Sequence, residues 1–268
     1  REPFMRAKID QSVTLACRKR GIAQERLDQL VSGIQRRIET LGESEIASKA
    51  IGGMVMDGPD VMQRRMPLAL AAGLVPVVHA IGDAATRATL DAFEATAEQW
   101  RALGLRPRLE HAQHMHPDDV RRAGRLGVVA SVQPIHLTFD LPSIAALLPD
   151  RSTRAYALRS LAAAGAPLAF GSDTPVASPD VFVGLRAACR RAAASGERLN
   201  MAEALSPDAA LAAYTTGAAY AIQAEHRSGM LRPGFDADIV ALSHDPLVSL
   251  DGLEVLATIK GGAFTYTA

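Results

Sequence analysis

The sequence is poor in the features that mark a disulfide scaffold, a nucleic-acid-binding protein or a membrane protein. It has only two cysteines, Cys17 and Cys189, which lie far apart and form no Cys-x-x-Cys pair, so we expect free buried thiols. The 29 basic residues are balanced by 29 acidic ones, so no overall field favours nucleic acid or an anionic membrane. We therefore expect neither nucleic acid nor a membrane as a partner, with a local charged patch as the open alternative.

Long apolar runs are also scarce. The longest, Met66–Ile81, is interrupted by Pro67, Gly73 and Pro76, and it is too short and too broken to span a bilayer. We expect a cytoplasmic protein. Because the chain begins at Arg1 rather than at a methionine, an upstream targeting segment stays an open alternative.

What the sequence does contain is ordinary globular composition and a regular alternation of elements. It is 48% hydrophobic and 22% charged, and 268 residues suffice for one barrel-sized domain. From about residue 74, strands alternate with helices, which predicts a parallel sheet covered by helices. The expected strands are Leu74–Val78, Arg108–Glu110, Val128–Val132 and Pro167–Phe170. One helix is expected between Asp83 and Gly104, a short one beginning at Pro117, and others near 153–164, 179–194 and 207–223.

Three ionisable residues follow three of these strands. His79, His111 and Asp173 each stand at or just past a strand's carboxyl end. In a (β/α)₈ barrel these ends converge on one mouth, where active sites lie. Two imidazoles and a carboxylate can hold a divalent metal that activates water, and a carboxylate can move the water's proton. Taken singly, each has another explanation: His79 as a helix-entry residue, His111 as a buried strand-end histidine, and Asp173 as a turn former.

Six motifs, in order, carry a family resemblance. The motifs are His79-Ala-Ile-Gly-Asp83, Glu110-His-Ala-Gln113, Ser131-Val-Gln-Pro-Ile-His136, Phe170-Gly-Ser-Asp-Thr-Pro-Val176, Ala213-Tyr-Thr-Thr-Gly-Ala-Ala-Tyr220 and Gly234-Phe-Asp-Ala-Asp-Ile-Val240. Together they resemble the amidohydrolase superfamily, specifically the YtcJ-like branch that includes N-substituted formamide deformylases, over roughly residues 51–268.

The resemblance implies an α/β fold, a (β/α)₈ TIM-barrel metal-dependent hydrolase with a small β-sandwich. It also implies roles for matching residues. His79 and His111 resemble metal-binding histidines of the fifth and sixth strands. Asp173 resembles the catalytic eighth-strand aspartate that binds metal or water and shuttles the proton. His136 and Gln133 match a substrate-contacting loop, and Asp83 resembles an outer residue that orients a ligand.

The N-terminal part of the chain departs from the family's pattern. No histidine precedes His79, although the family carries a His-x-His pair on its first strand. The pair His114-Met-His116 is in the wrong place, and we expect a solvated helix-entry loop there. Lys49 lies too far upstream of Asp57-Gly58 to match the family's bridging lysine. Four strands are expected after residue 74 and one more near Gly53–Met56, so part of the barrel's N-terminal half is missing.

We therefore predict three regions: an irregular, largely helical segment at 1–50, a partial TIM-barrel catalytic domain at 51–225, and a small β segment at 226–268. The predicted function is hydrolysis of a non-peptide carbon–nitrogen bond in a small amide or formamide, with a divalent metal, zinc being favoured. A homodimer is an open alternative. Two other interpretations remain: a truncated or decayed homologue without catalysis, and an iron oxygenase using the same ligand triad.

Overall fold

The protein is described by a computed structural model covering residues 58–148, 154–193 and 195–268. The chain divides into two units, Arg1–Met54 and Val55–Ala268, and all the described residues belong to the second. The segment expected at 1–50, the strand expected near Gly53–Met56 and Lys49 lie outside the described residues. Every helix in the described ranges is too short or too polar to span a bilayer.

A four-stranded parallel sheet forms the centre of this unit. Its order is β1-β2-β3-β4, which is also the order along the chain. All four expected strands are present, within three residues of the expected bounds. The strands are β1 (Val77–Ala80), β2 (Arg108–His111), β3 (Val129–Val132) and β4 (Leu168–Phe170).

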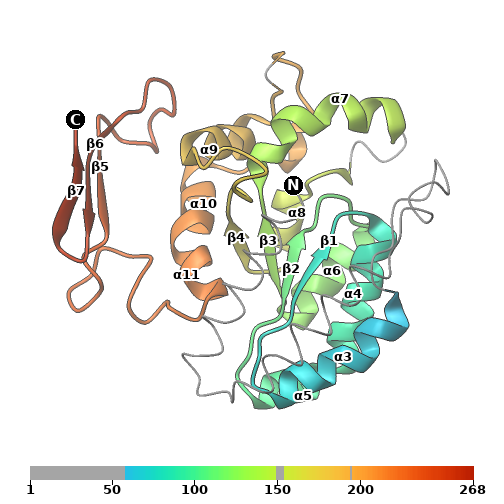
Figure 1. Ribbon diagram of the computed structural model, residues 1–268. Coiled ribbons are helices and arrows are strands. Elements are labelled where there is room, and N and C mark those ends of the chain that lie inside the picture. Colours follow the sequence, from blue (N-terminus) through green and yellow to red (C-terminus); the bar gives the residue numbers. More distant parts are fainter. Residues whose placement is uncertain (1–57, 149–153, 194) are drawn as a thin grey trace. The chain divides into compact units, whose positions relative to one another are not determined.

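Helices connect the strands, as a parallel sheet requires. Figure 1 shows α4 and α6 beside β1 and β2, and α10 and α11 beside β4. The barrel-type α/β architecture predicted from the motifs is thus present, with four parallel strands in the described residues. The helices are α3 (Pro59–Ala71), α4 (Asp83–Ala95), α5 (Ala97–Ala102), α6 (Pro117–Leu126), α7 (Leu137–Leu147), α8 (Leu158–Ala163), α9 (Val181–Arg190), α10 (Pro207–Ala212) and α11 (Ala218–Ala221), with short turns η1 (Pro134–His136), η3 (Met201–Glu203) and η4 (Ala213–Gly217).

Successive side chains along a strand point to opposite faces of the parallel sheet, and on β2 the two faces differ in character. Leu109 on β2 and Val132 on β3 have no exposed surface and pack in the main apolar cluster beneath the helices. Arg108 and Glu110 have the opposite parity on β2 and form an ion pair, 3.0 Å between Nε and Oε1. On β2, one face therefore packs in the core and the other carries charged groups. On β3 and β4 that second face is apolar, because Val129 and Ala169 pack with Ala221 in a small separate cluster.

The helix expected between Asp83 and Gly104 is interrupted. Its apolar positions Leu90, Phe93, Ala97 and Trp100 are all buried, as predicted. However, the helix breaks at Thr96, whose hydroxyl donates to the carbonyl of Ala92 at 2.8 Å. Such bonds from a threonine hydroxyl back to the preceding turn bend helices, so α5 continues in a new direction.

A close approach between α6 and the end of α8 requires a glycine. A Cβ atom added to Gly124 would lie 1.9 Å from the carbonyl oxygen of Ala164. We expect Gly124→Ala to lower the free energy of unfolding by about 1–3 kcal/mol, because the helices must separate. Gly82→Ala is the matched control, since its Cβ would meet nothing within 4 Å. Urea denaturation checks both, and equal stability of the two variants would contradict the close packing.

The C-terminal segment is a separate antiparallel sheet of order β5-β6-β7. The sheet is formed by β5 (Ile239–Leu242), β6 (Val255–Lys260) and β7 (Ala263–Thr267). A small β-sandwich was expected, and the described C-terminal residues form one of the two sheets that a sandwich needs. β6 and β7 form a hairpin: Gly261 and Gly262 have φ of 57° and 83°, as a tight primed turn requires. Arg190 of α9 pairs with Asp251 before β6, both contacts at 2.7 Å.

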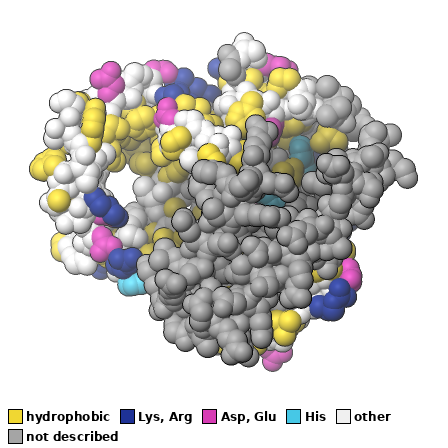
Figure 2. All heavy atoms as spheres, in the orientation of Figure 1, with side chains coloured by type: hydrophobic (Ala, Val, Ile, Leu, Met, Phe, Trp, Pro, Cys, Tyr) yellow, Lys and Arg dark blue, Asp and Glu magenta, His cyan; other side chains and the backbone are white. Residues whose placement is uncertain are grey.

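Figure 2 shows basic and acidic side chains interspersed with hydrophobic ones on the described part of the face in view. This mixture agrees with the net charge of zero.

Candidate functional site

The candidate site lies at the carboxyl ends of the parallel strands. His79 is on β1, His111 is the last residue of β2, and Asp173 follows β4. His136 ends η1, the turn that follows β3. Each strand therefore contributes one chemically reactive side chain at the same edge of the sheet, as the alternation of strands and helices predicts.

The backbone at two of these positions is left-handed. His111, Ala112 and Asp173 have φ of 75°, 47° and 60°. Non-glycine residues adopt this conformation at a cost and only where surrounding contacts impose it, often at functional sites. The turn after β2 and the loop after β4 are thus held in uncommon conformations where the side chains converge.

Three of these side chains form a group suited to a metal. His111, His136 and Asp173 each offer one ligand atom, and these atoms all lie within 4.8 Å of one another. The Nε2 atom of His136 is 3.8 Å from Oδ2 of Asp173, and the rings of His111 and His136 are nearly parallel with centroids 6.0 Å apart. The predicted ligands His111 and Asp173 are therefore brought together.

His79 lies next to this group. Its ring meets the ring of His111 edge-on, with centroids 4.3 Å apart. It supplies no ligand atom to the group of three, so its predicted role as a metal ligand stays a prediction.

The two imidazoles of the group are protected from water. His111 and His136 are 7% and 5% exposed. Burial lowers the pKa of His111 to about 4, with the neighbouring His79 adding to the effect, so the ring is neutral at pH 7. Nδ1 of His111 and Nε2 of His136 are buried without hydrogen-bond partners. A neutral His111 ring, with a free buried nitrogen on each of the two rings, fits a divalent metal.

Gln133 lies just before η1. Its amide nitrogen donates to the carbonyl of Ser131 at 3.3 Å and to the Glu110 carboxylate at 3.5 Å. Its amide oxygen is buried without a partner. A buried acceptor at the site agrees with the predicted substrate contact, which remains a prediction. Asp83 accepts a hydrogen bond from the backbone nitrogen of Ala84 at the start of α4, and its orienting role also remains a prediction.

Two residues of this region were missed from the sequence. Gln113 places its amide nitrogen 3.3 Å from Nδ1 of His136. Its backbone carbonyl accepts from the backbone nitrogen of Tyr156 at 2.6 Å, and the carbonyl of Tyr156 accepts from Arg191 at 2.9 Å. Gln113 belongs to the motif Glu110-His-Ala-Gln113, but no role was predicted for it. No sequence pattern indicates that Arg191 is important.

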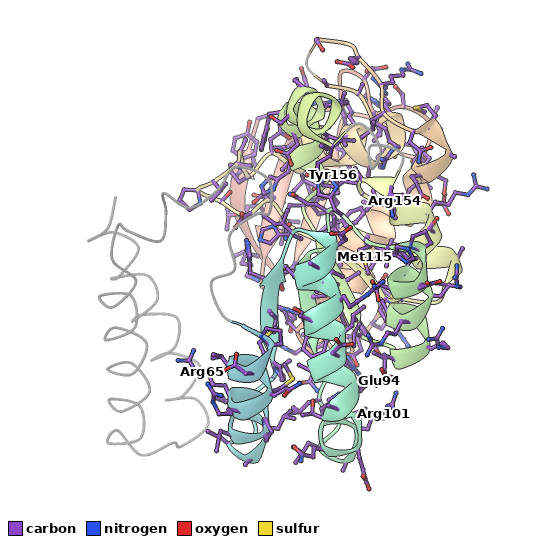
Figure 3. The ribbon with its side chains drawn as sticks, turned by 90° about the vertical axis from the view of Figure 1, so that its right-hand side faces the viewer. Arg65, Glu94, Arg101, Met115, Arg154 and Tyr156 are labelled. Carbon is purple, nitrogen blue, oxygen red and sulfur yellow. The ribbon has the colours of Figure 1, made fainter. Side chains whose placement is uncertain are left out.

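In the view of Figure 3, Tyr156 and Met115 lie above Glu94 and Arg101, which are at the lower end of the helices α4 and α5. Tyr156 is 1% exposed, and its hydroxyl donates to Asp140 of α7 at 2.5 Å. The segment around Tyr156 thus joins α7 to the turn that carries Gln113.

The expectation of a solvated loop at His114-Met-His116 is wrong for its first two residues. His114 and Met115 are 9% and 2% exposed. The loop runs beneath the segment around Ala155, with which His114 forms an isolated bridge. His116 is the helix-entry residue: its Nδ1 accepts from the backbone nitrogen of Asp118 at the start of α6.

Comparisons with known proteins divide the chain. Residues 1–58 match the ATP cone domain. The chain is also 74% identical over 58 residues to the transcriptional repressor NrdR of Novosphingobium aromaticivorans. That alignment covers 22% of this chain and 36% of the repressor. This match covers the stretch that was expected to be irregular.

The rest matches hydrolases. Residues 41–266 match the model of the amidohydrolase family. The chain is 31% identical over 222 residues to the putative amidohydrolase YtcJ of Bacillus subtilis, covering 80% of this chain and 41% of that protein. An uncharacterized metal-dependent hydrolase from Pyrococcus horikoshii superposes with a TM-score of 0.66 at 29% identity, covering 81% of this chain and 41% of that one.

The chain therefore spans about two fifths of the length of these hydrolase relatives. The family match nevertheless covers most of the chain, and the first four sequence motifs lie at the carboxyl ends of β1, β2, β3 and β4. Over residues 41–266 this chain belongs to the amidohydrolase family, in its YtcJ-like branch.

Proposed function

We propose that the chain hydrolyses a non-peptide carbon–nitrogen bond in a small amide or formamide, with a divalent metal, zinc being favoured. The observation that supports this most directly is the convergence of His111, His136 and Asp173 at one edge of the sheet. A divalent metal bound there supplies a Lewis acid that polarises a carbonyl and lowers the pKa of water.

Asp173 is the proton carrier in this proposal. Its side chain is 37% exposed and faces the buried ring of His136. A carboxylate in this position accepts the proton of the attacking water and delivers it to the leaving nitrogen. The free amide oxygen of Gln133 is available to accept a hydrogen bond from an N–H group of the substrate.

Metal removal tests the proposal. Dialysis against a chelator is expected to reduce hydrolysis of simple N-substituted formamides and amides by on the order of 10²-fold or more, and Zn²⁺ should restore it. The purified chain is analysed for metals beforehand, and dipeptides and esters are included in the substrate screen. Turnover that is indifferent to the chelator would refute a metal-dependent hydrolase. A chain that binds metal but hydrolyses nothing would support the alternative of a decayed homologue.

The N-terminal match supports a second candidate function. Because residues 1–58 match the ATP cone domain, we propose that this segment binds ATP. Calorimetric titration of the whole chain should show saturable binding of ATP, with CTP as the control. Equal, weak responses to both nucleotides would argue against it.

A further inference from the structure

Two alternative sets of three residues could bind a metal at the candidate site. The family resemblance implies His79, His111 and Asp173, whereas the side chains that converge are His111, His136 and Asp173. Two nitrogen or oxygen ligands at about 2.1 Å from one ion are at most about 4.2 Å apart. Atoms already within 4.8 Å of one another need to move by only about half an ångström to share an ion.

His136 has the stronger reason to bind a cation. It is only 5% exposed, and its Nε2 atom has no hydrogen-bond partner. An unsatisfied buried polar atom costs about 1–3 kcal/mol, which a bound ion would offset. His79, in contrast, lies on an exposed strand end and presents its ring to the ring of His111.

Gln113 controls which nitrogen of His136 is free. If its amide nitrogen donates to Nδ1, the proton of neutral His136 sits on Nε2 and blocks coordination. A half-turn of the amide puts the oxygen at the same 3.3 Å position, where it accepts from Nδ1–H and leaves the Nε2 lone pair free. Metal-ligating histidines generally donate their second ring N–H in this way.

We propose that this chain holds its metal through His111, His136 and Asp173, and that Gln113 accepts from Nδ1–H of His136 as the positioning residue. The assignment rests on the metal dependence of the proposed function and replaces the substrate contact expected of His136. It gives the chain a three-ligand set drawn entirely from residues at the ends of β2, β3 and β4, without the His-x-His pair of the family's first strand.

Metal affinity separates the two sets without any assay of turnover. Co²⁺ is titrated into the whole metal-free chain, with dissociation constants from calorimetry and coordination from the visible absorption bands. His136→Ala should raise the dissociation constant by on the order of 10²-fold or more, and His79→Ala by less than about tenfold. His244→Ala, an exposed histidine near β5, is the control that should change nothing.

Variants at Gln113 test the tautomer. Gln113→Leu should weaken Co²⁺ binding by about 10- to 100-fold, because Nδ1–H loses its acceptor. Gln113→Glu keeps an acceptor and should retain near-normal affinity. A merely space-filling role would instead predict near-normal affinity in Gln113→Leu as well, because leucine is of similar bulk. Thermal unfolding of each metal-free variant shows whether the fold is intact.

The outcomes are distinct. Strong loss in His79→Ala with little change in His136→Ala would restore the family's set and overturn the inference. Absence of Co²⁺ and Zn²⁺ binding by the unaltered chain would overturn both the inference and the proposed function. Tight binding that depends on His136, in a chain without hydrolytic activity, would uphold the inference and refute the function.

Discussion

Asp173→Asn is expected to lower kcat by about 10³-fold, because an amide cannot accept and return the proton of the attacking water. Asparagine is the appropriate substitution, since Asp173 has a left-handed backbone with φ of 60°. Asparagine tolerates that conformation nearly as well as aspartate, whereas most other side chains add strain. The loss of activity should therefore not be accompanied by misfolding.

Stability and metal content distinguish the proton carrier from a structural residue. Because the side chain of Asp173 is 37% exposed, the unfolding free energy should change by no more than about 0.5 kcal/mol. Steady-state kinetics on the best substrate, with metal analysis of each preparation, makes the measurement. Asp118→Asn, an exposed carboxylate in the first turn of α6, is the control and should keep full activity. Undiminished kcat in metal-loaded Asp173→Asn protein would show that another group moves the proton.

Local periodicity made much of this site predictable. Short apolar runs followed by polar residues located the four strands, and parallel strands necessarily bring their carboxyl ends to one edge. The positions of His111 and Asp173 follow from that rule. The proximity of His136 to both does not, because it depends on how η1 turns after β3, which no pattern in Ser131–His136 specifies.

The helix expected at 153–164 shows why other features were not predictable. The structure has α8 only from Leu158. The carbonyls of Ala155 and Tyr156 accept hydrogen bonds from Arg191, 36 and 35 residues further along the chain. Carbonyls that accept from a distant side chain point toward it and not along a helix axis, so they do not accept the backbone hydrogen bonds of a helix. Sequence patterns describe neighbours along the chain, and this contact joins segments that are neighbours only in the folded protein.

Arg191 itself is expected to be the residue whose loss most destabilises this unit. It is 0% exposed, although arginine is seldom fully buried without a partner. Burial lowers the pKa of its guanidinium to about 10, so it remains charged at pH 7. Its three nitrogens donate to the carbonyls of Leu199 at 2.7 Å, Tyr156 at 2.9 Å and Ala155 at 2.7 Å.

Arg191→Met should lower the free energy of unfolding by about 4 kcal/mol, because three buried carbonyls lose charged donors together. Arg191→Lys should recover only part of this, since an ammonium cannot reproduce the planar fork of donors. Arg190→Met is the neighbouring control: it removes an exposed ion pair with Asp251 and should cost at most about 1 kcal/mol. Urea denaturation of metal-free protein gives all three values.

Substitution of Arg191 should also lower the affinity of the site for metal. Arg191 holds the carbonyl of Tyr156, and the Tyr156 nitrogen donates to the carbonyl of Gln113, whose amide contacts His136. Arg191→Lys, if it folds, should therefore weaken Co²⁺ binding as well as stability, whereas Arg190→Met should leave the affinity unchanged. An Arg191→Lys variant that is destabilised but binds Co²⁺ normally would show that Gln113 keeps its position without this support, and would confine Arg191 to stabilising the fold.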